Sequence, residues 1–376
     1  MDLSPSASFS SLPPDKSQGI HASATKAFGK LCFSVVPLLY TQYSLETFVK
    51  ICGHPIFGSC VRRVGLSHTR FDPDDFDSLV QEMASWRLTR KELVQTVQLL
   101  SARCDAEEFL VAHDVNSLLE QAFYQLAKFN HSLTITISPN EFASIGRREI
   151  YLPDEDTQYF YADVPFTSSV VLQSAKRAGC RVSKLDIAVA SLRFCRDTDY
   201  DLSALMSSVS ELSLELTLIQ GGPEPQDFIQ WIKNLLFGST DVKNLDVCCM
   251  IFDDLDHHKF DPFGQLISRL PLEELSLSDI EISQQTMTNL VENLGPTLRR
   301  LCICSCDLDG SWKEVLVALQ QYALQLENLQ ISGSRQPWPD TLVVSRGITG
   351  VRLAIDKMLR VEQRAVSDRD AQGNEE

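Results

Sequence analysis

The sequence lacks any stretch of apolar residues long enough to cross a membrane. Its longest apolar run, residues 31–39, is nine positions long and contains a serine and a proline, whereas a membrane-spanning helix needs about 20 apolar residues. Positive charge is also scarce, because 34 Lys and Arg stand against 50 Asp and Glu and leave a net charge of −16. Such a surface would repel a phosphate backbone. We therefore expect no membrane span and no nucleic-acid partner.

Motifs of the common enzyme classes are missing as well. The sequence contains no Gly-x-Ser-x-Gly nucleophile turn, no phosphate-binding Gly-Lys-Ser loop and no Gly-x-Gly-x-x-Gly dinucleotide motif. We accordingly expect a protein that is not an enzyme and has no cofactor. One alternative stays open, a metal-dependent enzyme of unrecognised type that uses acidic loops such as Asp253 and Asp254 beside His257 and His258. Adjacent histidines do not readily aim at one ion, which favours a solvated loop.

The N-terminus lacks the features of a secretory signal, and the cysteines do not form an even set. The first two dozen residues are rich in Ser and Pro, without a basic segment followed by an apolar one. The 11 cysteines are odd in number, and most lie within apolar patterns such as residues 247–250. We therefore expect reduced thiols and a cytoplasmic or nuclear location.

What the sequence does contain is a repeat of apolar residues. In each of six copies, one apolar residue is followed three positions later by a second and two positions after that by a third. The central residues are Leu185, Leu212, Leu245, Leu275, Leu301 and Leu329. They lie 27, 33, 30, 26 and 28 positions apart, which is the spacing of leucine-rich repeats. The spacing predicts an α/β fold, a leucine-rich-repeat solenoid with parallel strands on the concave side and helices on the convex side.

Between the strands, amphipathic segments predict the returning helices. Apolar residues recur at three- and four-residue spacing from Pro225 to Gly238 and from Ser283 to Gly295. Ser311 and Glu314 have the spacing of a capping box before a third segment of this kind. Strands and helices therefore alternate as a repeat architecture requires.

In the first half of the chain the spacing is looser. Residues 61–66 match the strand pattern and residues 132–137 alternate Thr and Ile, whereas residues 76–83 and 118–126 have apolar faces at helical spacing. The distances between these segments are longer than one repeat. We expect an irregular, helix-rich N-terminal half joined to a regular array.

The domain organisation follows from where the repeat is regular. The expected units are a disordered N-terminus (1–24), an F-box remnant or N-terminal cap (25–60), irregular helix-rich N-terminal repeats (61–181), regular leucine-rich repeats (182–345), and a C-terminal helix with a disordered charged tail (346–376). An open strand edge invites aggregation. We therefore expect the N-terminal half to cover the first edge of the array, and residues 337–339, Pro-Trp-Pro, to close the last.

One stretch resembles a known family. Thr41-Gln-Tyr-Ser-Leu-Glu-Thr-Phe-Val-Lys-Ile-Cys-Gly-His-Pro-Ile-Phe followed by Val61-Arg-Arg-Val is similar to the segment just after the F-box in fungal F-box and leucine-rich-repeat-like proteins. The resemblance extends loosely over residues 25–335. It implies a protein-interaction scaffold, a substrate receptor of a ubiquitin ligase, in which the F-box holds a Skp-type adaptor and the repeats hold the substrate.

The F-box itself is truncated or degenerate. Leu12-Pro13-Pro14 resembles its opening and residues 25–32 the end of its last helix, with only a short polar stretch between them. The resemblance then implies that four residues near one residual helix would contact the adaptor. They are Phe28, Leu31, Cys32 and Val35. Their apolar surface is too small for the usual interface, so we expect weak or no adaptor binding, with packing on the repeats as the alternative role.

Strand parity predicts the residues that face a partner. Positions between and just after the two inward apolar residues of each strand must point to the concave surface. They are Asp186, Ser213, Glu215, Asp246, Cys248, Ser276, Ser278, Cys302, Cys304, Gln330 and Ser332. Three of them are acidic, which indicates a protein partner with a Lys- or Arg-rich surface, although a chain of net charge −16 also carries acids for solubility alone.

Three closely spaced cysteines raise a metal site as an alternative. Cys302 and Cys304 share one face of their predicted strand, whereas Cys306 falls at the inward position that closes the repeat. The next thiol, Cys248, lies two strands away, about 10 Å at ~4.8 Å per strand. A structural zinc site needs four ligands, so buried or structural thiols without a metal are the favoured interpretation.

Overall fold

The structure is a computed structural model of the whole chain. It describes residues 14–67, 69–71, 89–111, 114–138, 160–162, 164–189, 206–218, 225–251, 260–333 and 343–372. Within these residues the chain has a mixed α/β fold built on one ten-stranded, mostly parallel sheet. None of the described helices combines the length and the apolar character needed to cross a membrane.

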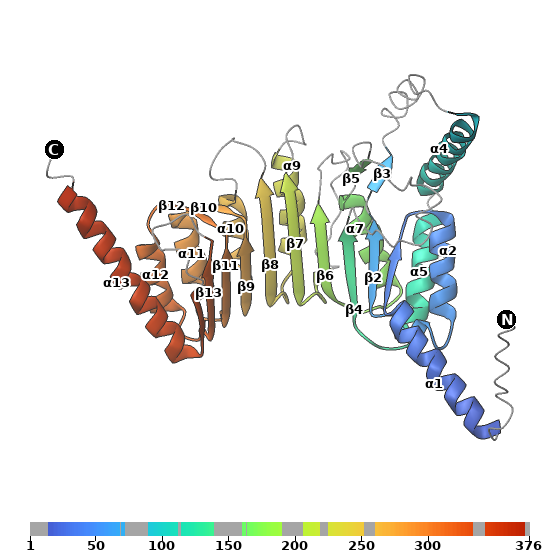
Figure 1. Cartoon of the computed structure of the whole chain (residues 1–376), viewed down its shortest axis with the longest axis horizontal. Coiled ribbons are helices and arrows are strands. Elements are labelled where there is room, and N and C mark those ends of the chain that lie inside the picture. The colour runs from blue at the N-terminus through green and yellow to red at the C-terminus, as the bar shows by residue number, and fades with distance from the viewer. Residues whose placement is uncertain are drawn as a thin grey trace, which may run out of the picture.

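The ten strands follow one another across the sheet in chain order. They are β1 (Val35–Leu38), β2 (Arg63–Ser67), β4 (Leu133–Ser138), β6 (Val182–Val189), β7 (Glu211–Leu218), β8 (Asn244–Ile251), β9 (Glu274–Ser278), β11 (Arg300–Cys304), β13 (Asn328–Ser332) and β14 (Val343–Arg346). Neighbouring strands are parallel, except that β14 runs antiparallel to β13. This order places residues far apart in the sequence side by side (Figure 1).

The six predicted strands lie next to one another in the predicted register. Leu185 pairs with Leu212 and Leu212 with Leu245, and the pairing continues through the central leucines of β9, β11 and β13. All six leucines are buried. The sheet therefore has one apolar face, as the two-residue alternation of the sequence requires.

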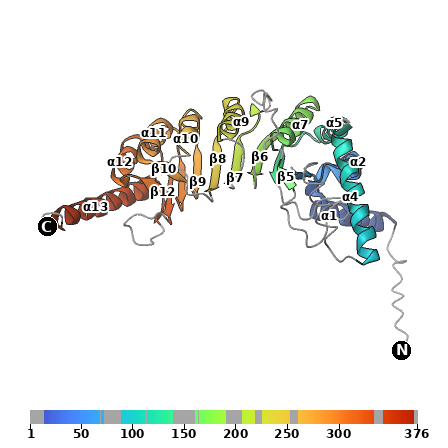
Figure 2. The same ribbon diagram turned by 90° about the horizontal axis from the view of Figure 1, so that it is seen from above.

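Several helices cover that apolar face. The described helices are α1 (Pro14–Phe33), α2 (Gln42–Gly53), α4 (Arg90–Val111), α5 (Asp114–Ala127), α7 (Val164–Arg177), α9 (Pro225–Phe237), α10 (Asp261–Ile267), α11 (Gln284–Leu294), α12 (Trp312–Tyr322) and α13 (Ile348–Gln372), with a short 3₁₀ helix η1 (Gly58–Cys60). Seen from above, the sheet bends into an arc with α7, α9, α10, α11 and α12 along its outer side (Figure 2). Among the described helices, none lies over β6 to β9 on the inner, concave side of the arc.

Two helix starts confirm the predicted caps, with one correction. Ser283 accepts a hydrogen bond from Thr286 N, and Ser311 accepts one from Lys313 N. The Ser311 backbone N–H does not bond to Glu314, as a capping box would have it, but donates to the Gln284 side chain at 2.7 Å. Adjacent repeats are thus joined by a side chain that replaces a local cap.

The N-terminal half, expected to be helix-rich and to cover the first edge of the array, does so with strands of its own. β1, β2 and β4 continue the same parallel sheet, so the sheet edge lies at β1 and not at β6. The alternating patterns at residues 61–66 and 132–137 correspond to β2 and β4, and α5 covers the predicted helix at 118–126. The helix predicted over residues 76–83 lies outside the described residues. Long segments between these strands hid the repeat spacing in the sequence.

Both ends of the chain contain more helix than expected. Residues 14–24, predicted to be disordered, form the start of α1, where Pro14 stands at the first position, the place at which a helix tolerates proline. Within the segment 346–376, expected to be a helix followed by a disordered tail, α13 continues as far as Gln372. Val351, Ile355 and Met358 anchor that helix on the core. Once this part of α13 is formed, each residue that extends the helix adds a backbone hydrogen bond without the cost of starting a new helix.

The last strand edge is closed by β14 and α13. β14 pairs antiparallel with β13, from Asn328 opposite Arg346 to Ile331 opposite Val343, and α13 begins directly after it. The segment at residues 337–339, which we expected to close this edge, lies outside the described residues. Two small sheets, β3 (Thr69–Phe71) with β5 (Phe160–Ala162) and β10 (Glu281–Ser283) with β12 (Asp307–Asp309), lie beside the main one.

Candidate functional site

The helix-free side of the main sheet, here called the sheet face, carries straight rows of side chains. In the middle row, register aligns six of the predicted residues on six successive strands. They are Asp186, Ser213, Asp246, Ser276, Cys302 and Gln330. Each stands between two buried apolar residues of its strand. The buried neighbours point to the helices, so these six point away from them.

A second row lies nearer the carboxyl ends of the strands. It contains the other predicted residues, Glu215, Cys248, Ser278, Cys304 and Ser332, aligned by the same pairings. Most of these side chains are half-buried, and Glu215 is exposed. All the residues predicted to face a partner therefore lie together on one surface.

A third row, at the amino ends of the strands, was not predicted. It contains five charged residues and two asparagines, in the order Lys184, Glu211, Asn244, Glu274, Arg300, Asn328 and Arg346. These residues directly precede the first inward leucine of each strand, except on the antiparallel β14. The prediction from strand alternation considered only the positions between and after the two inward residues of each strand. The same alternation, applied to the position before the first inward residue, would have found this row.

The third and middle rows line a groove that crosses the strands. Its volume is about 380 Å³, and it runs from Lys184 on β6 to Arg346 on β14. Ser213, Ser276 and Cys302 form part of its floor. Short side chains on the floor leave the sheet accessible to a partner.

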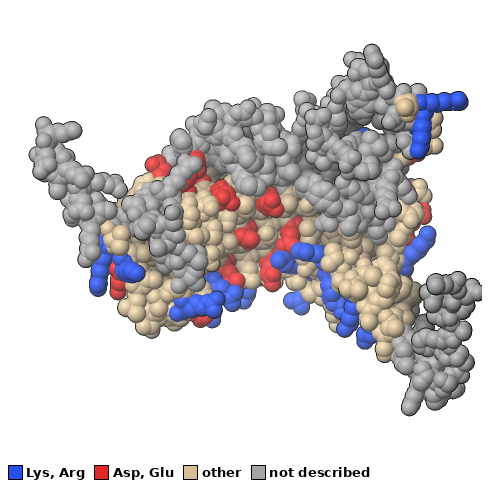
Figure 3. Space-filling model, in the orientation of Figure 1, with Lys and Arg blue, Asp and Glu red and all other residues tan. Residues whose placement is uncertain are grey.

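The charges of the sheet face are arranged in zones. Figure 3 shows acidic side chains gathered over the middle of the sheet, with Lys and Arg on both sides of them. Glu211 lies 4.0 Å from Lys184 on one side, and Glu274 lies 3.1 Å from Arg300 on the other. The two flanks thus consist of ion pairs, while the centre contains Glu215 and Asp246.

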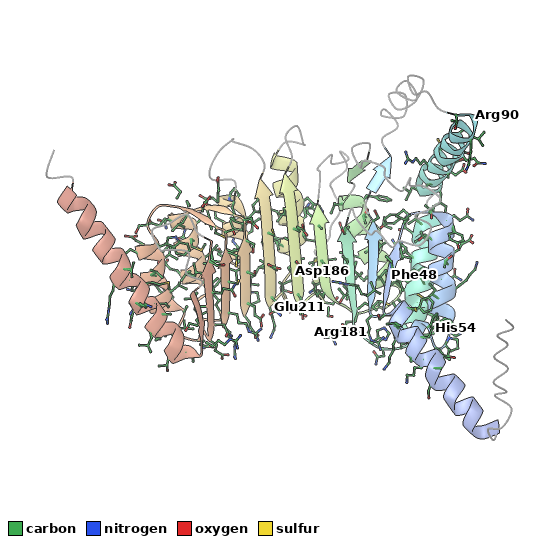
Figure 4. All side chains as sticks on the ribbon, viewed as in Figure 1. Phe48, His54, Arg90, Arg181, Asp186 and Glu211 are labelled. Carbon is green, nitrogen blue, oxygen red and sulfur yellow. The ribbon has the colours of Figure 1, made fainter. Side chains whose placement is uncertain are left out.

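Asp186 differs from the other two acids of the predicted set. Its Oδ2 accepts a hydrogen bond from Arg63 on β2 at 2.6 Å, and its Oδ1 lies 3.4 Å from the Lys184 ammonium. Only 16% of its side chain is exposed. Figure 4 shows Asp186 on the sheet beside β7, the strand that begins with Glu211. Asp186 therefore joins the N-terminal strands to the array, and its charge is already paired with Arg63 and Lys184.

Loss of the Arg63 side chain is expected to lower the free energy of unfolding by about 1 kcal/mol, because it leaves a half-buried carboxylate with one cation in place of two. Chemical denaturation of Arg63→Ala measures this. Arg269→Ala is the control, since Arg269 is exposed and forms no ion pair with another described residue. A double-mutant cycle with Asp186→Asn should give a coupling energy above the error. Equal effects of the two arginine variants would contradict the assignment.

Glu215 and Asp246 form no ion pair with another described residue. Beside them, the Cys248 thiol donates a hydrogen bond to the Asp279 carboxylate at 3.6 Å. Burial raises the pKa of Cys248 to about 11, with further contributions from the charge and hydrogen bond of Asp279 and from the charges of Glu215 and Asp246. The carboxylates of Asp279, Glu215 and Asp246 thus surround this thiol with negative charge.

Alkylation of Cys248 should report this local charge. With a pKa of about 11, the thiolate fraction, and with it the rate of iodoacetamide labelling, is expected to rise tenfold per pH unit from pH 7 to pH 10. Asp279→Asn should lower the pKa and raise the rate at pH 8 severalfold. Asparagine tolerates the positive φ of 54° at this position. Asp241→Asn is the control, and an equal acceleration in both variants would contradict the account.

The cysteines in and just after β11 lie on the sides of the sheet that strand alternation predicts. Cys302 and Cys304 share one side of β11, with 3.5 Å between their Sγ atoms, whereas Cys306 is fully buried and donates its S–H to the Leu277 carbonyl at 3.4 Å. Cys248 lies two strands away. Among the described residues, no group of three or more His, Cys, Asp and Glu is arranged to hold a metal. The loop with Asp253, Asp254, His257 and His258 lies outside them.

The four residues expected to contact an adaptor are split between two elements. Phe28, Leu31 and Cys32 lie on α1, whereas Val35 lies on the edge strand β1 and not on the helix. The exposed fraction is 83% for Leu31, 52% for Phe28 and 45% for Val35. Phe28 also contacts Phe57, with 6.2 Å between ring centroids. The helix thus packs on the rest of the chain and still leaves apolar surface exposed.

Comparison with known proteins adds no family assignment. The sequence matches no protein-family model, and a search of curated proteins finds no match.

Proposed function

We propose that the chain is a non-enzymatic interaction scaffold of the leucine-rich-repeat type, which binds a protein partner on its sheet face. The observation that carries the proposal is the groove of about 380 Å³ across β6 to β14, floored by short polar side chains on a rigid parallel sheet. The repeat spacing of 26 to 33 residues and the helices on the outer side of the arc support the solenoid class.

The arrangement of charges on the sheet face indicates the chemistry of the partner. Glu215 and Asp246 lie on neighbouring strands and are not neutralised by another described residue, whereas the acids on either side are paired with Lys184 and Arg300. A partner segment that places Lys or Arg side chains over the middle of the sheet would gain from this field, and its association would be steered and salt-sensitive. We therefore propose a Lys- or Arg-rich peptide segment as the ligand.

A peptide library displayed on phage tests the proposal with the full chain. Peptides retained by the wild-type chain should be enriched in Lys and Arg, and their affinity should fall as salt rises. Glu215→Gln with Asp246→Gln should weaken their binding about tenfold or more. Glu292→Gln with Glu314→Gln is the control of equal charge change, on exposed positions of the helices α11 and α12. Selected peptides without basic residues, or equal binding to both variants, would contradict the proposal.

The resemblance to F-box proteins adds a second candidate role, a link to a ubiquitin ligase through a Skp-type adaptor in the cytoplasm or nucleus. The observation in its favour is the exposed apolar surface of Leu31, Phe28 and Val35. One helix and one edge strand offer little area, so we propose weak adaptor binding at most.

Titration of the full chain with a purified fungal Skp-type adaptor decides how strong this link is. Binding weaker than micromolar, and lost in Leu31→Glu, is the expected result. Lys30→Glu on the same helix is the control. Nanomolar binding would contradict the proposal of a weak contact, and binding that Leu31→Glu leaves unchanged would contradict the proposed surface.

A further inference from the structure

Two thiols of β11 lie side by side on the sheet face. Cys302 and Cys304 alternate along the strand, and their Sγ atoms are 3.5 Å apart. Both side chains are half-buried, and Cys302 lines the groove. The pair is therefore accessible to a small molecule from the concave side.

A disulfide between these two cysteines does not fit the strand. Residues two apart in a parallel strand are separated by about 6.6 Å along it, whereas the Cβ atoms of a disulfide lie about 3.5–4.5 Å apart. β11 is held in register on both sides, by β9 and by β13. Closing the bond would distort a strand that both neighbours fix. The pair is consequently suited to remain two thiols that act together on one ligand.

The polar surroundings of Cys304 suit such a ligand. Its Sγ accepts hydrogen bonds from the Ser332 hydroxyl at 3.2 Å and from the Gln330 amide at 3.7 Å, both on β13. These two donors remain partners for the sulfur after it loses its proton. Cys306, in contrast, is fully buried and bonds to backbone carbonyls. Cys302 and Cys304 thus form an accessible pair of thiols, whereas Cys306 does not take part in it.

The spacing of the sulfurs restricts the ligand. With bonds of about 2.3 Å to sulfur, as in zinc sites, a spacing of 3.5 Å gives an angle of roughly 100° at the bridging atom. A linear two-coordinate ion would need its sulfurs about 4.6 Å apart on the same bond length. Tetrahedral zinc would need further ligands, and the described residues hold no group of three or more His, Cys, Asp and Glu for a metal. A trivalent, pyramidal atom that already carries one substituent fits the site. It accepts an angle of roughly 100° between its two sulfur bonds, and it needs no further ligand from the protein.

We propose that Cys302 and Cys304 form a dithiol site for trivalent organoarsenicals. In the reaction with an organoarsenous oxide, each thiol loses its proton and forms one sulfur–arsenic bond. The arsenic–oxygen bonds break, and the oxygen leaves as water with the two protons. Arsenic stays trivalent and no sulfur is oxidised, so no further reactant is needed. The proposal does not depend on the proposed function, because it concerns the thiol pair alone.

Titration of the full chain with phenylarsine oxide, followed by native mass spectrometry, tests the site. One adduct per chain is expected at low molar ratio, because the second thiol binds at the high effective concentration of the first. A dithiol such as dithiothreitol should remove it, and glutathione at equal thiol concentration should not. Cys302→Ser and Cys304→Ser should each weaken binding about 100-fold. Cys32→Ser and Cys104→Ser, which replace exposed single thiols, should change nothing.

Peptide mapping of the adduct and a second pair of variants keep the test decisive. The adduct should map to the peptide that contains Cys302 and Cys304. Cys302→Ala and Cys304→Ala should repeat the result of the serine variants with an unchanged thermal unfolding midpoint. An adduct that maps elsewhere, that persists in the variants of either cysteine, or that glutathione removes as readily as dithiothreitol would overturn the proposal.

Discussion

Replacing Trp312 by alanine is expected to lower the free energy of unfolding by about 3–5 kcal/mol, the usual range for truncating a large aromatic residue in a core. Trp312 opens α12 and is completely buried. Its side chain lies in the continuous core between the sheet and its helices. The loss should be large because repeats on either side share this core, and each repeat contacts only its neighbours.

Chemical denaturation monitored by circular dichroism measures this change. Phe237→Ala is the control, because Phe237 is also a large aromatic residue at a helix end but is 84% exposed. The control should change the free energy of unfolding by no more than about 0.5 kcal/mol. Similar losses in the two variants would show that the described packing of α12 on the sheet is wrong.

Reversing the charge of Glu215 and Asp246 together is expected to abolish the binding of Lys- or Arg-rich peptides, with a loss of at least about 100-fold in affinity. Two lysines at these positions would replace an attractive centre by a repulsive one, and like charges brought together at an interface cost several kcal/mol. Burial raises the pKa of the neighbouring Cys248 to about 11, and the charges of Asp279, Glu215 and Asp246 make smaller contributions in the same direction. Affinities measured by calorimetry at two salt concentrations test the expectation.

The matched control reverses two charges on the other side of the molecule. Glu292→Lys with Glu314→Lys changes the net charge by the same amount at exposed helix positions, so it should reduce affinity only through the weak long-range field. Thermal unfolding of both variants should stay within a few degrees of the wild-type chain. Equal losses of affinity in the two variants would assign the effect to net charge and not to the sheet face.

The central strands could be predicted from the sequence because their pattern is local. Each strand carries two alternating apolar residues, and the distance from Leu275 to Leu301 or from Leu301 to Leu329 is one repeat. Register follows from this alternation, since a slip by one residue would turn the apolar set to solvent. For the same reason, strand parity alone is enough to place Cys302 and Cys304 on one face of β11.

The link between the two halves of the molecule could not be predicted in this way. Arg63 and Asp186 are 123 positions apart in the sequence, and β4 must insert between their strands before they can meet. No local pattern encodes that approach. β1 was missed because Val35 directly follows a segment with a helical pattern. The predicted bounds of α1 and α13 were too short because the polar composition of their outer ends is also typical of disordered segments.

Photo-cross-linking can show whether a partner lies on the sheet face over β6 to β14, as we propose. A photoreactive amino acid is placed at Ser213 or Ser276, on the floor of the groove, and at Asn289, an exposed position of α11. Each chain is irradiated with a selected Lys- or Arg-rich peptide. Our expectation is that covalent adducts form from Ser213 and Ser276 and that none forms from Asn289. An adduct only from Asn289, or from none of the three positions at saturating peptide, would contradict it.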